Sequence, residues 1–91
     1  MLTAIILMNV ARGTVNEVAG QLAGLDGVSE VFSVGGRYDL VVMVRVPSNE
    51  RLATLVTSDM AANSSIEHTE TLIAFQAFSR HDLEAMFSIG S

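Results

Sequence analysis

At its centre this 91-residue chain reads Gly35-Gly36-Arg37-Tyr38-Asp39-Leu40, a polar and flexible stretch between two strongly apolar segments. The glycines can adopt the positive φ values of a tight turn, and they let another group approach the backbone closely. Tyr38 adds a flat ring with a hydroxyl, and Asp39 adds a carboxylate suited to an ammonium or guanidinium group. We interpret the stretch as a hairpin that carries a binding site. The alternative is an ordinary turn in which Asp39 caps the hairpin or pairs with an arginine, Arg37 or Arg45.

Alternating apolar residues on both sides of this turn predict strands. Residues 28–34 form the weaker strand before it, and residues 38–46 form the stronger one after it, which Pro47 ends. The same alternation predicts a strand at residues 2–10 and another from about residue 66 to residue 78. The first and third strands along the chain are the most apolar, so we expect them at the centre of the sheet.

Two amphipathic helices separate these strands. The first is predicted to open with a capping box, in which Thr14 caps the helix and Glu17 reaches back, and to end near Gly24 and Gly27. The second is predicted to begin after Ser48 as N-cap and to end near residue 63.

The resulting order, β-α-β-β-α-β, is the ferredoxin-like arrangement of the α+β class. Right-handed crossovers place both helices on one side of a four-stranded antiparallel sheet with strand order 4-1-3-2. We expect one domain at residues 1–78 and a short tail at residues 79–91, where Ser79 as cap and Asp82 at N3 predict one helical turn.

The sheet face away from the helices should also be apolar. Bulky or apolar residues occupy the positions that alternate away from the helices: Ile5, Leu7, Val41, Met43, Leu72 and Ala74. An antiparallel sheet with one face in water would carry polar residues there. An apolar patch of this size is unusual on a monomer, so we predict a homo-oligomer in which two copies pack sheet on sheet.

Composition narrows the function classes. Hydrophobic residues make up 49% of the chain and charged residues 16%, against about 25% charged residues in an ordinary soluble domain. The net charge is −5, so the chain lacks the basic surface that direct nucleic-acid binding needs. No apolar run is long enough to span a membrane, and the first residues lack the basic region of a signal peptide. The absence of cysteine agrees with a cytoplasmic location.

Taken in order, these motifs resemble the effector-binding and oligomerisation module (RAM domain) of the leucine-responsive/asparagine regulator family, Lrp/AsnC. The resemblance covers residues 2 to about 78. It rests on the opening apolar strand, the helix end Leu25-Asp26-Gly27-Val28, the hairpin Gly36-Arg37-Tyr38-Asp39-Leu40 and the last strand, Thr69-Glu70-Thr71-Leu72-Ile73. Family members carry a winged helix-turn-helix domain before this module, so we expect a stand-alone version here.

The resemblance implies a function and a set of residues. In the family, dimers form sheet to sheet and assemble into rings, commonly octamers, with amino-acid effectors in clefts between dimers. Carried over, one wall of the cleft would be Gly36, Arg37, Tyr38, Asp39 and Leu40, with Asp39 facing the ammonium group of the ligand. Thr69 and Thr71, from a neighbouring subunit, would complete it, although edge-strand propensity explains threonine there equally well. Co-assembly with a full-length regulator of the family is an alternative role.

Enzyme and metal functions are disfavoured. His68 and His81, the only histidines, stand thirteen positions apart, and no acidic residue joins them at zinc-ligand spacing, so we expect no metal and no cofactor. Residues 79–82 include serine, histidine and aspartate, but neighbours on one turn cannot form a catalytic relay. Dimeric α+β barrel enzymes share the predicted topology. They need a polar pocket between helices and sheet, whereas the inward faces here are almost wholly aliphatic.

Overall fold

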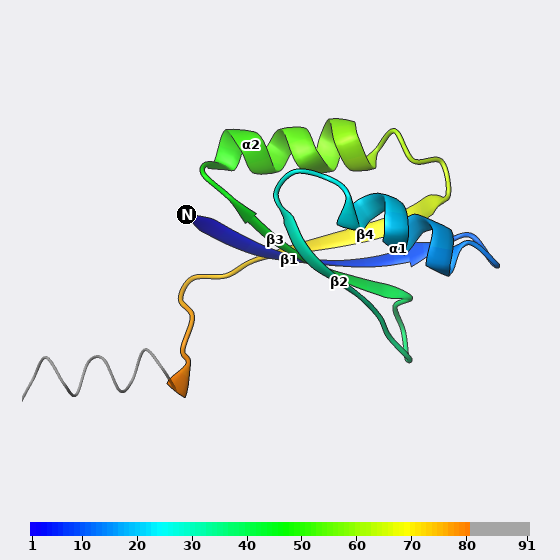
Figure 1. Ribbon diagram of the computed structural model, residues 1–91, viewed down its shortest axis with the longest axis horizontal. Helices are drawn as coiled ribbons and strands as arrows, with labels where there is room; N and C mark the ends of the chain where they lie inside the picture. Colours follow the sequence, from blue (N-terminus) through cyan, green and yellow to red (C-terminus); the bar gives the residue numbers. More distant parts are fainter. Residues whose placement is uncertain (81–91) are drawn as a thin grey trace, which may run out of the picture.

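Two long strands, β1 (Leu2–Val10) and β3 (Leu40–Val46), form the centre of a four-stranded antiparallel sheet in the computed structural model, which describes residues 1–80 (Figure 1). The edge strands are β2 (Val28–Ser33) and β4 (Ile66–Ile73), and the order β2-β3-β1-β4 confirms the predicted topology. The helices are α1 (Val15–Ala23) and α2 (Asn49–Thr54), and α2 continues directly into a π-helical segment, η1 (Leu55–Met60). The fold is therefore the ferredoxin-like α+β sandwich.

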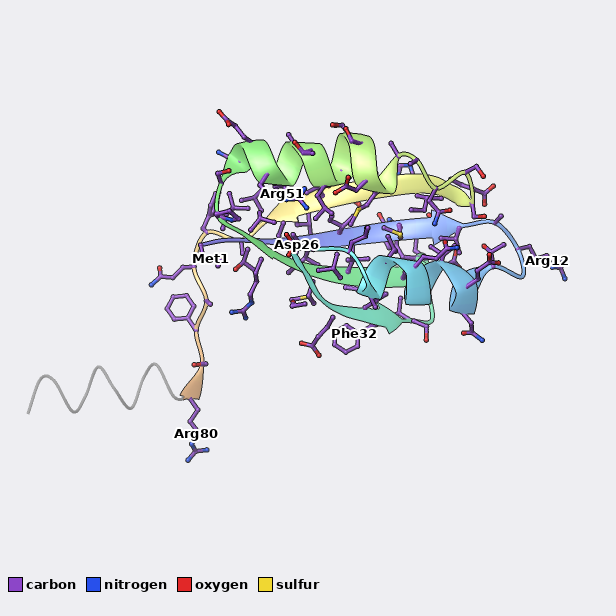
Figure 2. All side chains as sticks on the ribbon, turned by 45° about the horizontal axis from the view of Figure 1, so that its top comes forward. Met1, Arg12, Asp26, Phe32, Arg51 and Arg80 are labelled. Carbon is purple, nitrogen blue, oxygen red and sulfur yellow. The ribbon has the colours of Figure 1, made fainter. Side chains whose placement is uncertain are left out.

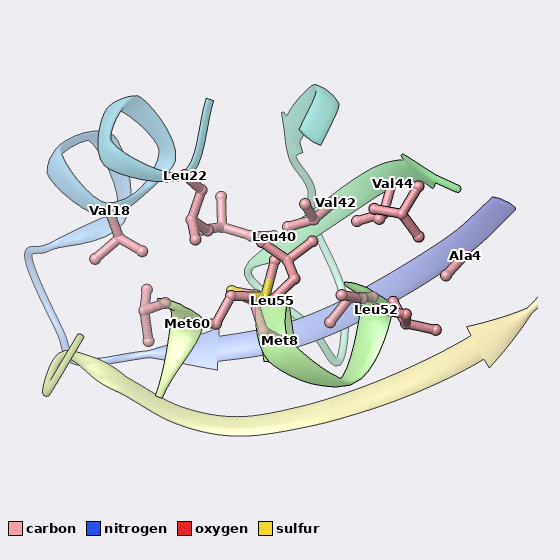
Figure 3. Close-up of a cluster of buried hydrophobic side chains, with 13 residues drawn as sticks. Ala4, Met8, Val18, Leu22, Leu40, Val42, Val44, Leu52, Leu55 and Met60 are labelled. Atoms are coloured by element: carbon pink, nitrogen blue, oxygen red, sulfur yellow. The ribbon is translucent and has the colours of Figure 1, made fainter. Parts of the chain in front are cut away.

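The hydrophobic core lies between the helices and one face of the sheet. Alternate residues of the central strands are buried there, because a strand presents every second side chain to the same face. Side chains of α1, α2 and η1 meet those of β1 and β3 in one cluster (Figure 3). Its thirteen buried members are Ala4, Ile6, Met8, Val10, Val18, Leu22, Leu40, Val42, Val44, Val46, Leu52, Leu55 and Met60.

One of the two predicted helix caps is present. The Ser48 hydroxyl accepts the backbone N–H of Arg51 at 3.1 Å, as predicted. The capping box at Thr14 and Glu17 was wrong: Thr14 occupies the N-cap position, but its side chain makes no cap hydrogen bond. Its hydroxyl instead donates to the Ala11 carbonyl oxygen at 2.6 Å. The Thr14 N–H donates to the same oxygen and closes a local turn. Because the Thr14 side chain bonds within this turn, it does not cap the helix.

The last strand is shorter than the alternation predicted. It ends at Ile73, opposite Ala4, rather than near residue 78. Because its partner β1 begins at Leu2, only two β1 residues lie beyond Ala4, so a strand to residue 78 would run past the sheet. The Ala74 N–H still donates to the Thr3 carbonyl oxygen at 2.9 Å. The strands beside the hairpin are also shorter, ending at Ser33 and beginning at Leu40. The helical turn predicted from Ser79 and Asp82 extends outside the described residues.

Gly27 joins α1 to β2 at a point where a side chain would not fit. Its φ is +97°, and an added Cβ would lie 2.8 Å from Cγ1 of Val46. Its carbonyl oxygen accepts the Arg45 N–H at 2.8 Å. At the helix end that contributes to the family resemblance, the backbone at Gly27 thus lies close to β3. Only glycine fits there without strain.

Among residues 1–80, no helix covers the second face of the sheet (Figure 1). We call this surface the open sheet face; its apolar members are Ile5, Leu7, Phe32, Val41, Met43 and Leu72, and the register places Glu30, Arg45 and Glu70 on the same face. The register sets Met43, Ile5 and Leu72 in one row across three strands. Phe32 and Leu72 remain 47% and 44% exposed, so the predicted apolar surface is present. Within residues 1–80, no helix is long and apolar enough to cross a membrane.

Candidate functional site

The hairpin between β2 and β3 forms as predicted. The Val34 N–H donates to the Asp39 carbonyl oxygen at 3.0 Å and closes the loop. Gly36 has a φ of 110°, whereas Gly35 does not have a positive φ. Only the second glycine is therefore required by the backbone conformation. The side chain of Arg37 is exposed, so the loop presents polar groups to solvent.

Asp39 ties this hairpin to the end of β1. Its Oδ2 atom accepts the Val10 N–H at 2.9 Å and lies 3.5 Å from the Asn9 side-chain nitrogen. The same nitrogen of Asn9 donates to the Arg37 carbonyl oxygen at 2.9 Å. No ion pair joins Asp39 to Arg37 or Arg45 in the part of the chain that the structure describes. The carboxylate therefore has a structural role, through backbone and amide groups rather than through an arginine.

We expect Asp39→Ala to lower the free energy of unfolding by about 1–3 kcal/mol, because it leaves the N–H of a buried residue, Val10, without its acceptor. Urea unfolding at one fixed protein concentration measures the loss. Asp26→Ala removes an exposed carboxylate that makes no side-chain hydrogen bond, and we expect it to change stability by no more than about 0.5 kcal/mol. Equal losses in the two variants would show that Asp39 does not anchor the hairpin.

Tyr38 links the hairpin to the far edge strand. Its hydroxyl donates to Oε2 of Glu70, which lies on β4 between Thr69 and Thr71. That hydrogen bond, reinforced by the charge of Glu70, raises the pKa of Tyr38 above its ordinary value. A short bridge therefore spans β1 on the surface of the sheet. Glu70 and Asn9 were not among the predicted site residues. Glu70 stood inside a quoted motif, but only the strand register shows that it faces Tyr38.

The two threonines lie on β4, in register with the start of β3. Leu40, Met8 and Thr69 occupy one row of the sheet, so Thr69 stands two strand spacings, about 10 Å, from Leu40. Thr69 is half-buried and lines a hollow of about 280 Å³ beside η1, together with Met60, Ile66 and His68. Thr71 is exposed. The hollow that Thr69 lines does not include the hairpin residues 35–40.

Leu40 differs from the other predicted residues. Its side chain is fully buried in the core, so only its backbone can face a ligand. Within residues 1–80, no three histidine, aspartate or glutamate side chains lie close enough together to hold a metal ion. His81 lies outside the described residues. The groups at the hairpin are hydrogen-bond donors, carboxylates and an aromatic hydroxyl, which suit recognition of a small charged molecule.

Comparison with protein families identifies the domain. A model of the Lrp/AsnC ligand binding domain matches residues 3–83. The chain belongs to the Lrp/AsnC family. This Lrp/AsnC domain is 34% identical over 74 residues to the HTH-type transcriptional regulator FL11 of Pyrococcus furiosus, a match that covers 80% of the chain and 48% of FL11. It thus spans about half the length of the regulators that it matches.

Solved structures place the domain among proteins of its own size. A crystal structure of TTHA0845 from Thermus thermophilus is 40% identical, with a TM-score of 0.82, and the match covers 88% of this Lrp/AsnC domain and all of that chain. The hypothetical protein PHS023 from Pyrococcus horikoshii is 34% identical, with a TM-score of 0.80 and coverage of 89% and 98%. The fold is also that of the Neisseria meningitidis regulator NMB0573 in complex with L-Met, at 12% identity, a TM-score of 0.78 and coverage of 87% and 53%.

Proposed function

We propose that this chain is a non-enzymatic module that binds an amino acid in clefts between subunits and couples that binding to its assembly. The match of nearly the whole chain to the Lrp/AsnC ligand binding domain carries the proposal. The complex of NMB0573 with L-Met supports the ligand class, because that protein shares the fold. The regulator relatives support action on transcription and a cytoplasmic location.

The hairpin would form one wall of such a cleft. Gly36 and Arg37 offer exposed backbone groups for the ligand carboxylate, and Leu40 contributes backbone only. Asp39 has its Oδ2 engaged by Val10, and Glu70, hydrogen-bonded to the neighbouring residue Tyr38, would supply a second carboxylate. An ammonium group would satisfy this local negative charge. Thr69 and Thr71 of a neighbouring subunit would form the other wall, since the hollow that Thr69 lines in its own subunit does not include the hairpin.

The ligand would shift assembly only if it binds two assembly states with different affinity. A cleft shared between subunits meets this condition, because its two walls come together only in the assembled state. We infer that homo-oligomers, dimers joined at the open sheet face and then rings of dimers, are the binding-competent form.

Thermal unfolding against each of the twenty amino acids tests the proposal. A ligand at about 100 times its Kd adds about 2.7 kcal/mol per site, which raises the midpoint of a domain of this size by several degrees or more. Because Asp39→Ala weakens the fold itself, we choose Thr71→Val as the site variant: an exposed, nearly isosteric change. It should abolish most of the ligand-induced shift while leaving the midpoint without ligand unchanged. An unchanged midpoint with all twenty would overturn the amino-acid proposal.

A second role follows from the regulator relatives. The matched part of FL11 is about half of that protein, and two such domains of related sequence could share a sheet-to-sheet interface. We propose that mixed assemblies with a full-length Lrp/AsnC regulator are an additional route to transcriptional control. Co-expression with a tagged regulator of the family should recover both chains in one complex, and Ile5→Lys on the open sheet face should abolish it. Separate elution of the two wild-type chains would exclude this role.

A further inference from the structure

The chain beyond β4 carries two exposed aromatic side chains. Phe75 is 102% exposed and Phe78 is 74% exposed. They belong to residues 74–78, which we call the arm. In Figure 1 the arm leaves the sheet on the side away from α2, and the turned view in Figure 2 agrees. Exposed phenylalanines in pairs are unusual on a folded surface, whereas single exposed apolar residues are not.

The arm leaves its own sheet after one hydrogen bond. The bond from the Ala74 N–H to the Thr3 carbonyl oxygen is the last that joins it to β1, and β1 extends only one residue further in that direction, to Leu2. Residues 75–78 have no hydrogen bond to the remainder of residues 1–80. Leu72, which lies on the open sheet face two residues before the arm, is 44% exposed. The exposed apolar surface of that face therefore reaches the base of the arm.

We propose that the arm packs on a second copy of this chain, where Phe75 and Phe78 of each subunit cover the partner's sheet in a symmetric exchange. This inference rests on the sheet-to-sheet assembly proposed above and adds the residues that lock it. The arm projects toward the side on which that partner would lie, since α2 and α1 cover the other face. In a twofold pair each arm reaches across the interface, so the contact closes and does not extend into fibres.

The area and charge of the arm fit a second copy. A buried phenylalanine hides about 150 Å² or more, so the four rings of a symmetric pair, with Phe78 only 74% exposed at the start, would hide roughly 500 Å² or more. A stable interface needs about 1,200–2,000 Å² in total, and the arms alone would supply a large part of the lower value. The chain has a net charge of −5, but residues 74–79 carry no charge. The arm therefore adds contact between two acidic copies without adding repulsion.

Photo-crosslinking tests the exchange directly. p-Benzoylphenylalanine at position 75 replaces one aromatic side chain by another, and equal amounts of isotopically light and heavy protein are mixed, equilibrated and irradiated. We expect light–heavy crosslinked dimers whose attachment points lie on the open sheet face or the base of β4. The same probe at Arg12, an exposed residue in the loop between β1 and α1 (Figure 2), should give none.

Substitution then measures the contribution of the arm. Phe75→Ala with Phe78→Ala should raise the dimer Kd at least about 100-fold by sedimentation equilibrium, whereas Gln76→Ala, in the same arm, should leave it unchanged. Far-ultraviolet circular dichroism should show a folded chain in both variants, because neither ring belongs to the core. If the wild type is a dimer and the double variant has the same dimer Kd, the arm does not contribute to the interface. Crosslinks found only within one chain would likewise contradict packing of the arm on the partner. Either result would leave the proposed sheet-to-sheet assembly unaffected. A wild-type chain that stays monomeric overturns both.

Discussion

Ile5→Lys should convert the assembled protein into folded monomers. Ile5 lies at the middle of the row formed with Met43 and Leu72 on the open sheet face. In a sheet-to-sheet dimer the lysine of each copy would be buried against apolar side chains without a partner charge. Burying an unpaired charge costs several kcal/mol, so we expect the dimer Kd to rise by at least about a thousandfold, at 1.4 kcal/mol per factor of ten.

Light scattering after gel filtration measures the change, and Ala53→Lys is the matched control. Ala53 is exposed on α2, on the opposite side of the sheet. The Ala53→Lys substitution therefore adds the same charge at a place where we expect no partner subunit to pack. We expect Ala53→Lys to elute with the wild type and Ile5→Lys to elute as a monomer with unchanged circular dichroism. Identical masses for all three proteins would place the interface elsewhere on the domain.

Leu55→Ala should lower the free energy of unfolding by about 2–5 kcal/mol, the range for a large-to-small substitution in a packed core. Leu55 is the first residue of η1 and is fully buried among the side chains of the central strands (Figure 3). Total stabilities of about 5–15 kcal/mol are usual, so this one change removes a large share.

Urea unfolding of the monomeric Ile5→Lys background separates this loss from any effect on assembly. Ser58→Ala, exposed in the same π-helical segment, should change stability by no more than about 0.5 kcal/mol. A loss below about 1 kcal/mol for Leu55→Ala would mean that η1 does not hold the second helix against the sheet.

The sequence predicted the fold well because each decisive feature is local. Alternating aliphatic residues mark β1 and β3 as central strands, and Ser48 caps the second helix as its position indicates. The failures are tertiary. β4 does not reach residue 78 because β1 begins at Leu2, and Thr14 bonds Ala11 because of the turn before it. The pattern of apolar residues along one segment cannot predict the end of β4 or the side-chain partner of Thr14.

The site was less predictable than the fold. The hairpin could be located, but the function of Asp39 as an acceptor for Val10 depends on the register of two strands far apart in sequence. The contact between Tyr38 and Glu70 crosses β1 for the same reason. Leu40 was predicted as a site residue because it follows Asp39 in the hairpin motif. It is the first residue of β3, and its side chain lies on the face of that strand that is buried in the core.

Calorimetric titration of an amino acid into the wild type and into Ile5→Lys shows whether the ligand site needs two subunits. The ligand is the one that raises the unfolding midpoint in the twenty-compound scan. We expect saturable heat with the wild-type assembly and none with the folded monomer, because the proposed cleft is completed only by a neighbouring subunit. Equal affinity in the two proteins would contradict this expectation, since the site would then lie within one subunit.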